Sequence, residues 1–146
     1  MPQLAYDLVV VPLDFSEASQ NALAAAVEMA GDSKKVHAVH VLPPLEAMSP
    51  GVVWGDVSDD RRETAVREFA KKFLTEHGAE DATFVVRFGS AGHEITSYAD
   101  ENNASLIVVS SHGFHGIKRM LLGSVAEAVI RHAHCPVLVM RRTDAE

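Results

Sequence analysis

Short, almost continuously apolar runs recur along this chain, and segments with helical character separate them. A strand that is covered on both faces has no polar side, so it reads as an unbroken apolar run rather than an alternating one. The runs occupy residues 8–13, 36–42, 83–87, 105–109 and 136–140. Five strands that alternate with four helices predict an α/β protein, an open doubly wound parallel sheet with helices on both faces.

Capping and stop signals place the first elements. Ser16 is suited to cap a helix over residues 17–30, and Gly31 follows that helix as its usual terminator. Two consecutive prolines end the second strand, and residues 45–57 then have the proline and glycine content of a long surface loop.

The remaining helices are predicted from their apolar faces. Residues 58–74 are amphipathic, residues 88–92 turn the chain into a third helix that fades at 101–103, and the fourth helix covers residues 126–131. The side chains expected to face the sheet are Ala65, Phe69, Phe73 and Leu74 in the second helix and Ile95, Tyr98 and Ala99 in the third.

Composition bounds the class of protein. The 146 residues suit one domain, 1–146, and 47% hydrophobic against 23% charged residues gives no signature of disorder. A formal charge of −7 argues against binding to nucleic acid or to an anionic membrane. A lone cysteine, Cys135, no signal-peptide pattern and no apolar stretch of membrane-spanning length together predict a soluble, cytoplasmic protein.

The segment after the fourth apolar run carries the strongest functional signal. Glycines at 113, 116 and 123 let the backbone approach a ligand, and the segment closes on Gly123-Ser124 at a helix start. The N–H groups of a first helical turn point at negative charge, and Ser124 is suited either to cap that helix or to give its hydroxyl to a phosphate oxygen. Simple turn geometry is the alternative explanation of the glycines. The segment predicts a phosphate site, of the kind that holds a nucleotide.

A second group is expected to meet this segment across the sheet. Ligands of open α/β sheets bind at the carboxyl ends of the strands, where the strand order reverses. If the first and fourth strands are central neighbours, Asp14, at the end of the first strand, faces residues 110–123. Asp14 is then either a ligand group or a turn aspartate at a strand end.

Histidines carry weaker signals. His112 and His115 flank the glycine segment and can contact phosphates, but no partner is visible that would make either one a general base. Three potential metal ligands lie close together in the sequence at His132, His134 and Cys135. Yet a metal site with four ligands normally needs a second, separated pair of ligands. We therefore predict neither a catalytic residue nor a metal site.

Several enzyme classes lack their chemistry here. The first strand–helix turn has no GxGxxG glycines and the chain has no GxxxxGK[ST] segment, which argues against a dinucleotide oxidoreductase and a P-loop hydrolase. A phospho-accepting receiver needs a second aspartate after the third strand, where this chain has Arg87-Phe88-Gly89. Aromatic residues are 6% of the chain, too few to favour a flavin carrier.

These residues together resemble the universal stress protein family along nearly the whole chain. Val11-Pro12-Leu13-Asp14 is similar to the family's first turn, whose aspartate contacts adenosine, and Val41 matches a position that lines the adenine pocket. The family motif Gly-x2-Gly-x9-Gly-Ser/Thr matches at Gly113 and Gly123-Ser124, with Ser110 in place of the first glycine. The resemblance implies strand order 3-2-1-4-5, in the adenine nucleotide α-hydrolase-like fold.

The resemblance also implies a ligand. The expected ligand is ATP, or ADP or AMP, with Mg²⁺, bound by a stress-response protein that is at most a slow ATPase or an autophosphorylating protein. A nucleotide-free, dimeric interaction module of the same fold is the alternative, since a serine Cβ at 110 can narrow a site that the family lines with glycine. The hydroxyl of Ser110 is equally able to bond a phosphate oxygen. The expected binding residues are Pro12, Leu13, Asp14, Val41, Ser110, His112, Gly113, Gly116, Gly123, Ser124 and Val125.

The last apolar run is expected to be an interface. Residues 136–140 end the family's strand order, so they form a sheet edge, and they hold no lysine or internal proline to blunt it. Antiparallel pairing of two copies across a two-fold axis would bury Val137, Leu138 and Val139. We expect a homodimer through this strand.

Overall fold

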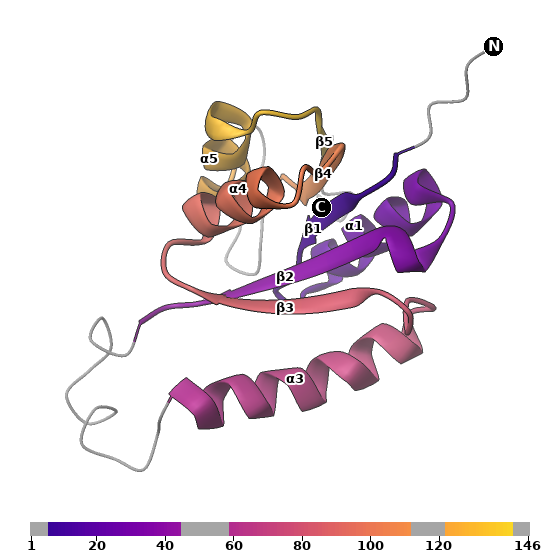
Figure 1. Cartoon of the computed structure of the whole chain (residues 1–146), viewed down its shortest axis with the longest axis vertical. Coiled ribbons are helices and arrows are strands. Elements are labelled where there is room, and N and C mark those ends of the chain that lie inside the picture. The colour runs from indigo at the N-terminus through magenta and orange to yellow at the C-terminus, as the bar shows by residue number, and fades with distance from the viewer. Residues whose placement is uncertain (1–5, 45–58, 112–121, 142–146) are drawn as a thin grey trace, which may run out of the picture.

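One parallel sheet of five strands forms the centre of the molecule, in the order β3-β2-β1-β4-β5 (Figure 1). The computed structural model describes residues 6–44, 59–111 and 122–141. All neighbouring strands are parallel, so the predicted fold class and strand order are confirmed, with strand ends shifted by one residue at most. The strands are β1 (Val9–Pro12), β2 (Val36–Leu42), β3 (Thr83–Phe88), β4 (Leu106–Ser110) and β5 (Val137–Met140).

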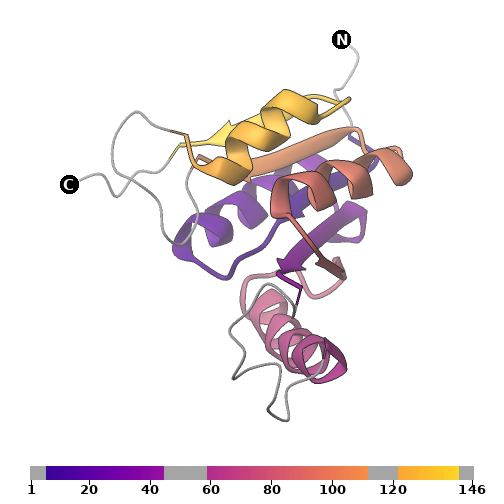
Figure 2. The ribbon, with the colours of Figure 1, turned by 90° about the vertical axis from the view of Figure 1, so that its left-hand side faces the viewer.

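Helices cover both faces of the sheet, as the alternation predicts. The helices are α1 (Glu17–Ala30), α3 (Asp59–Glu76), α4 (Ala91–Glu101) and α5 (Ser124–His132). The first two pack on one face, and α4 and α5 lie together on the other (Figure 2). A short 3-10 helix over Ser33–Lys35, which was not predicted, joins α1 to β2.

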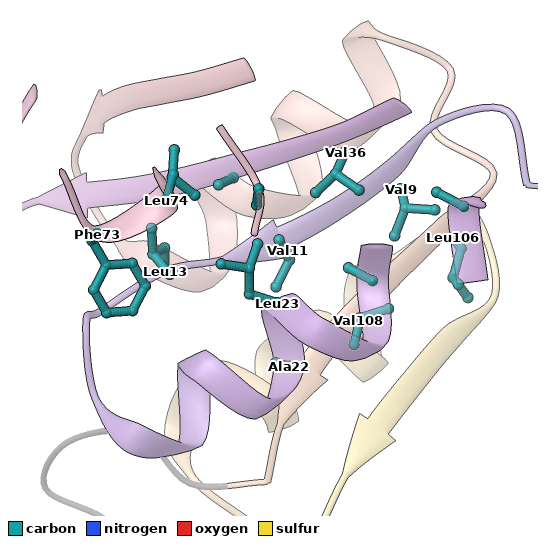
Figure 3. Packing of buried hydrophobic residues seen from close by; sticks show 14 residues of the cluster. Val9, Val11, Leu13, Ala22, Leu23, Val36, Phe73, Leu74, Leu106 and Val108 are labelled. Atoms are coloured by element: carbon teal, nitrogen blue, oxygen red, sulfur yellow. The ribbon is translucent and has the colours of Figure 1, made fainter. Parts of the chain in front are cut away.

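The core on the α1 and α3 side is built from alternate residues of the inner strands (Figure 3). Val9 and Val11 of β1 are fully buried there, together with Leu23 of α1. Phe73 and Leu74 of α3 belong to the same layer. Burial of one such side chain stabilises the fold by about 1.5–3 kcal/mol, so this layer holds the central strand in place.

The opposite layer brings α4 and α5 into close contact. Val10, Ile107 and Val129 are fully buried in it. Gly92 of α4 faces Ala128 of α5, and a Cβ built on Gly92 would lie 2.4 Å from the Ala128 Cβ. The close approach of the two helices therefore requires glycine at position 92.

The predicted signals at the ends of α1 are confirmed. The Ser16 hydroxyl oxygen accepts the Ser19 N–H at 3.1 Å, which satisfies one of the free donors of the first turn. Gly31 ends the helix with φ of 78°, a left-handed conformation that suits glycine, and its N–H donates to the Val27 carbonyl. α1 therefore begins after Ser16 and ends before Gly31, as the sequence predicts.

The buried face of α3 differs in part from the prediction. Phe73 and Leu74 are buried as predicted, at 6% and 3% exposure, but Ala65 is exposed and Phe69 is 57% exposed. Ala70 is fully buried instead. It lies three residues before Phe73 and four before Leu74, so all three share one face of the helix. α3 covers the edge strand β3 (Figure 1). An edge strand has only a small area to bury against a helix, so Ala65 and Phe69, at the side of α3, stay exposed.

The predicted inward face of α4 is confirmed. Ile95, Tyr98 and Ala99 are all buried against the sheet. The loop predicted over residues 45–57 lies outside the described residues. Within the described ranges, no helix is both long enough and apolar enough to cross a lipid bilayer.

Candidate functional site

The pairing of β1 with β4 stops before the carboxyl ends of the two strands. They pair at only two positions, Val9 with Leu106 and Val10 with Ile107, although two more residues follow in β1 and three more in β4. On their other sides, β1 stays paired with β2 and β4 with β5 to their last residues. The strand order reverses at this point, which is where open α/β sheets bind ligands.

Pro12 explains the early end of this ladder. Successive residues of a parallel strand direct their N–H and C=O groups to opposite neighbours, and Leu13 donates its N–H to the Val39 carbonyl of β2 at 2.8 Å. Pro12 therefore faces β4, and it has no N–H to donate. The proline therefore interrupts only the carboxyl end of the β1–β4 ladder, while the β1–β2 ladder continues to Pro12 and Val39.

Asp14 makes three of the hydrogen bonds that hold the turn between β1 and α1. Its Oδ1 accepts the Ser16 N–H at 3.0 Å and the Ser16 hydroxyl at 2.5 Å. The Asp14 N–H donates to the Ser19 hydroxyl at 3.3 Å. The interpretation of Asp14 as a turn aspartate is confirmed. The same bonds hold its carboxylate at the carboxyl end of β1, where a ligand role would need it.

Phe15 adopts a rare backbone conformation directly after Asp14. Its φ is 65°, in the left-handed region, where a bulky residue costs on the order of 1–3 kcal/mol. The ring centroid of Phe15 lies 4.9 Å from that of His40, 4.9 Å from Phe69 and 5.2 Å from Phe73. Rings from β2 and α3 thus hold the strained turn, and no sequence signal predicted this role for Phe15.

His40 and Val41 bring the end of β2 to the same turn. The His40 Nδ1 lies 2.6 Å from the Leu13 carbonyl oxygen. A carbonyl can only accept, so Nδ1 carries the proton and donates. The β1–β2 ladder ends at Pro12 and Val39, and the Leu13 carbonyl therefore bonds to a side chain where a regular ladder would pair it with the Val41 N–H. Val41 itself is half-buried on the α4 side of the sheet.

The first turn of α5 is held beside the end of β4. The Gly123 N–H donates to the Ser111 carbonyl at 2.6 Å, and the Ser111 N–H donates to the Met140 carbonyl at 2.8 Å. Gly123 is the N-cap residue, with the extended φ and ψ of −66° and 159°. Of the two roles considered for Ser124, capping of this helix is wrong, because Ser124 is already the first residue of the helix.

The start of α5 suits an anion. The N-cap residue Gly123 makes no side-chain cap, and no described residue accepts a hydrogen bond from the N–H groups of Ser124 and Val125, which belong to the first turn that an intrahelical bond cannot satisfy. The helix dipole adds partial positive charge at the same place. Ser124 is exposed, which leaves its hydroxyl accessible, and Val125 is half-buried against the core.

The other predicted loop residues lie at or beyond the end of β4. Ser110 is the last residue of β4, half-buried and paired in register with Met140 of β5. His112, Gly113 and Gly116 lie outside the described residues, as does His115. The structure brings the remaining predicted residues to the carboxyl ends of β1, β2 and β4 and the start of α5: Pro12, Leu13, Asp14, Val41, Ser110, Gly123, Ser124 and Val125.

A charged cluster that was not predicted borders Val41. Arg87 of β3 is the register partner of Val41. The Arg87 Nε lies 3.0 Å from Glu94 Oε1, and its Nη1 lies 3.0 Å from Glu101 Oε2. Hydrogen bonding to Glu101 is the main reason that the pKa of Arg87 is raised. The signal that could have found the cluster is the spacing of Glu94 and Glu101, two turns apart on one helix face.

A second polar pair lies between α4 and the opposite end of β2. The His37 Nδ1 is 2.5 Å from the Tyr98 hydroxyl. Burial lowers the pKa of His37 and raises the pKa of Tyr98, so both groups stay uncharged at neutral pH. His37 is near the amino end of β2, so this pair supports helix packing and is no part of the carboxyl-end site.

The histidines and the cysteine near the end of the chain do not converge. His134 Nδ1 lies 2.7 Å from Asp100 Oδ2 on α4. Burial raises the pKa of the Cys135 thiol, and Asp100 adds to the effect. Among residues 6–44, 59–111 and 122–141, no group of three or more His, Cys, Asp or Glu side chains is placed to hold a metal ion.

The fold and the site define a class: a doubly wound parallel α/β protein with a glycine-capped helix start at its topological switch point. The family model of the universal stress proteins matches residues 5–141. The chain belongs to the universal stress protein family.

Individual relatives agree with this assignment. Universal stress protein MJ0531 of Methanocaldococcus jannaschii is 34% identical over 97% of this chain and 85% of its own length. The solved structure of hypothetical protein MJ0577 is 28% identical, with a TM-score of 0.70 over 94% of this chain and 97% of that one. A universal stress protein solved in complex with cAMP is 27% identical, with a TM-score of 0.64 over 93% of this chain and 97% of that one.

Proposed function

We propose that this chain is a stress-response protein that binds an adenine nucleotide at the carboxyl ends of β1 and β4, where their pairing has ended. The observation that carries the proposal is the first turn of α5. That turn has no side-chain cap among the described residues, and the bond from Gly123 to Ser111 holds it beside β4. Phosphate is a ligand that such a turn stabilises. The relative solved with cAMP, itself an adenine nucleotide, supports the proposal.

In this proposal, different residues contact different parts of the nucleotide. Asp14 binds the adenosine, Val41 lines the adenine, and Ser110, Ser124 and Val125 contact the phosphates. The ligand is ATP, and Mg²⁺ supplies positive charge to its phosphates. This neutralisation matters here because the chain itself carries a formal charge of −7.

Calorimetric titration with ATP and Mg²⁺ tests the proposal. Loss of one hydrogen bond to a charged phosphate costs about 1.5–3 kcal/mol, so Ser124→Ala should weaken binding by about tenfold or more. Ser90→Ala is the matched control, because Ser90 stands at the start of α4 and makes no side-chain capping bond. It should bind ATP as the wild type does. Absence of binding to the wild type at millimolar ATP would refute the proposal.

The alternative is a nucleotide-free interaction module of the same fold. Ser110 favours it, because its Cβ stands half-buried at the end of β4, where the family motif has glycine. Denaturing the purified protein and assaying the supernatant for adenine nucleotide separates the two functions. Released nucleotide supports the binding protein, and a chain that neither releases nor binds it supports the interaction module.

We further propose that the chain forms a homodimer through β5. β5 is an edge strand, paired only with β4 in the described sheet. Ile107 and Ser111 donate to the carbonyls of Pro136 and Met140, so the backbone groups of Val137 and Val139 face outward. An edge with such free groups is a template for a second copy, and two-fold pairing closes the assembly.

Val139→Pro tests this interface. The variant removes an outward N–H, which an edge strand tolerates within its own sheet but which a paired strand needs. Val139→Ala keeps the N–H and is the control. Lysine at 137 or 138 is a less selective change, because Val137 and Leu138 also pack into the core layers. We expect dimers for wild type and Val139→Ala and monomers for Val139→Pro. A wild-type mass of 15.8 kDa by light scattering at micromolar concentration would exclude the dimer.

A further inference from the structure

His40 contacts the residues on both sides of Asp14. Its Nδ1–H donates to the Leu13 carbonyl at 2.6 Å, and its ring centroid lies 4.9 Å from that of Phe15. Leu13 is held from its other end as well, since its N–H donates to the Val39 carbonyl at 2.8 Å. One histidine side chain on β2 thus holds the chain immediately before and immediately after the Asp14 carboxylate.

The turn at Asp14 depends on this support. Phe15 has φ of 65°, and a bulky residue keeps such a conformation only where its surroundings hold it. If the ring of Phe15 were released, its backbone would relax toward negative φ. The bond from the Ser16 N–H to Asp14 Oδ1, 3.0 Å long across that residue, would then lose its geometry. The position of the carboxylate is therefore coupled to the packing of Phe15.

We propose that His40 is a positioning residue of the nucleotide site. It acts through Leu13 and Phe15 to hold the Asp14 carboxylate at the carboxyl end of β1, where the nucleoside is bound. The inference rests on the proposed function for its consequence in binding. The link from His40 to Asp14 itself rests on the contacts of the ligand-free chain.

His77 offers a matched control. Its Nδ1 lies 2.7 Å from the Phe73 carbonyl oxygen, and its ring centroid lies 4.3 Å from that of Phe73. His77 therefore makes the same two kinds of contact as His40, just beyond the end of α3, but both are with Phe73 and neither is with Leu13 or Phe15. His40→Phe and His77→Phe each remove one histidine–carbonyl bond and keep an aromatic ring.

ATP affinity is the first readout. His40→Phe should weaken binding by about tenfold, or about 1.4 kcal/mol, and His77→Phe should leave it unchanged. In an Asp14→Asn background, His40→Phe should have little further effect, because His40 acts through the carboxylate. His40→Asn keeps a donor near the Nδ1 position and should recover part of the loss. Equal losses in the two phenylalanine variants, or additive losses with Asp14→Asn, would overturn the proposal.

Hydrogen exchange of the Ser16 amide is the second readout and needs no nucleotide. This amide donates to Asp14 Oδ1, so by NMR it should exchange faster in His40→Phe than in wild type and at the wild-type rate in His77→Phe. Unchanged exchange in His40→Phe would overturn the proposal even if ATP affinity fell. If the wild type binds no ATP, the proposed function fails, while faster exchange would still establish that His40 positions Asp14.

Discussion

Replacing Gly92 with alanine should destabilise the fold by about 1–3 kcal/mol, the usual cost of an extra methyl group in a closed packing site. The new Cβ would lie 2.4 Å from the Ala128 Cβ. Carbon atoms pack at about 3.5–4.0 Å, so α4 and α5 would have to separate at their crossing. For a chain of this length the loss corresponds to a Tm lower by about 2–12 °C. Thermal and urea unfolding followed by circular dichroism would measure it.

The sign of this effect is informative because helix propensity alone points the other way. Alanine is favoured over glycine by about 1 kcal/mol in a helix interior. Gly92 is the second residue of α4, where the preference has the same direction, so without the contact the substitution should be neutral or stabilising. The contact partner supplies the control. Ala128→Gly removes the clashing methyl group, and the double variant Gly92→Ala, Ala128→Gly should be more stable than the sum of the single effects implies. A neutral Gly92→Ala, or strictly additive effects, would refute the packing argument.

Three further substitutions test separate features. Ser110→Gly should tighten ATP binding by calorimetry if the serine Cβ crowds the phosphates; weaker binding would assign the contribution to its hydroxyl. Ser105→Ala should lower the free energy of unfolding by about 1–2 kcal/mol. Ser105 Oγ accepts the Leu8 N–H at 3.2 Å and donates to the Leu8 carbonyl at 3.0 Å, and the variant loses both bonds. An unchanged urea midpoint would contradict this prediction. Burial lowers the pKa of His37 below 6.5. The unfolded chain therefore binds more protons, and stability should fall as the pH drops below that value. His37→Asn should flatten the urea midpoint between about pH 7 and 5, and an equally steep profile would assign the dependence to other groups.

The sheet was predictable because burial on both faces leaves a direct mark on sequence. Val9, Val10 and Val11 are all fully buried, and only a strand covered on both faces needs three such residues in succession. The face of α3 was less predictable. Phe69 is apolar and follows the helical period, yet its exposure is decided by the edge strand that α3 covers, and that relation exists only in the folded chain.

In the candidate site, the placement of the residues was predictable and their local geometry was not. The family's strand order, which the motifs supplied, brings Asp14 and Gly123 to the same end of the sheet. The local geometry at each position could not be predicted, because distant residues decide it. The φ of Phe15 is maintained by rings from β2 and α3. The cap of α5 falls on Gly123 rather than Ser124, and a bond to Ser111 fixes it there.

Because the Gly123 N–H donates to the Ser111 carbonyl at 2.6 Å, a hydrogen bond joins the two residues at which the intervening segment begins and ends. The entropic cost of closing such a loop grows with the logarithm of its length, by only about 0.6 kcal/mol for each doubling. Insertions and deletions between the two residues should therefore cost the sheet little stability. The length and sequence of this segment can therefore change while the strands and helices on either side of it stay the same.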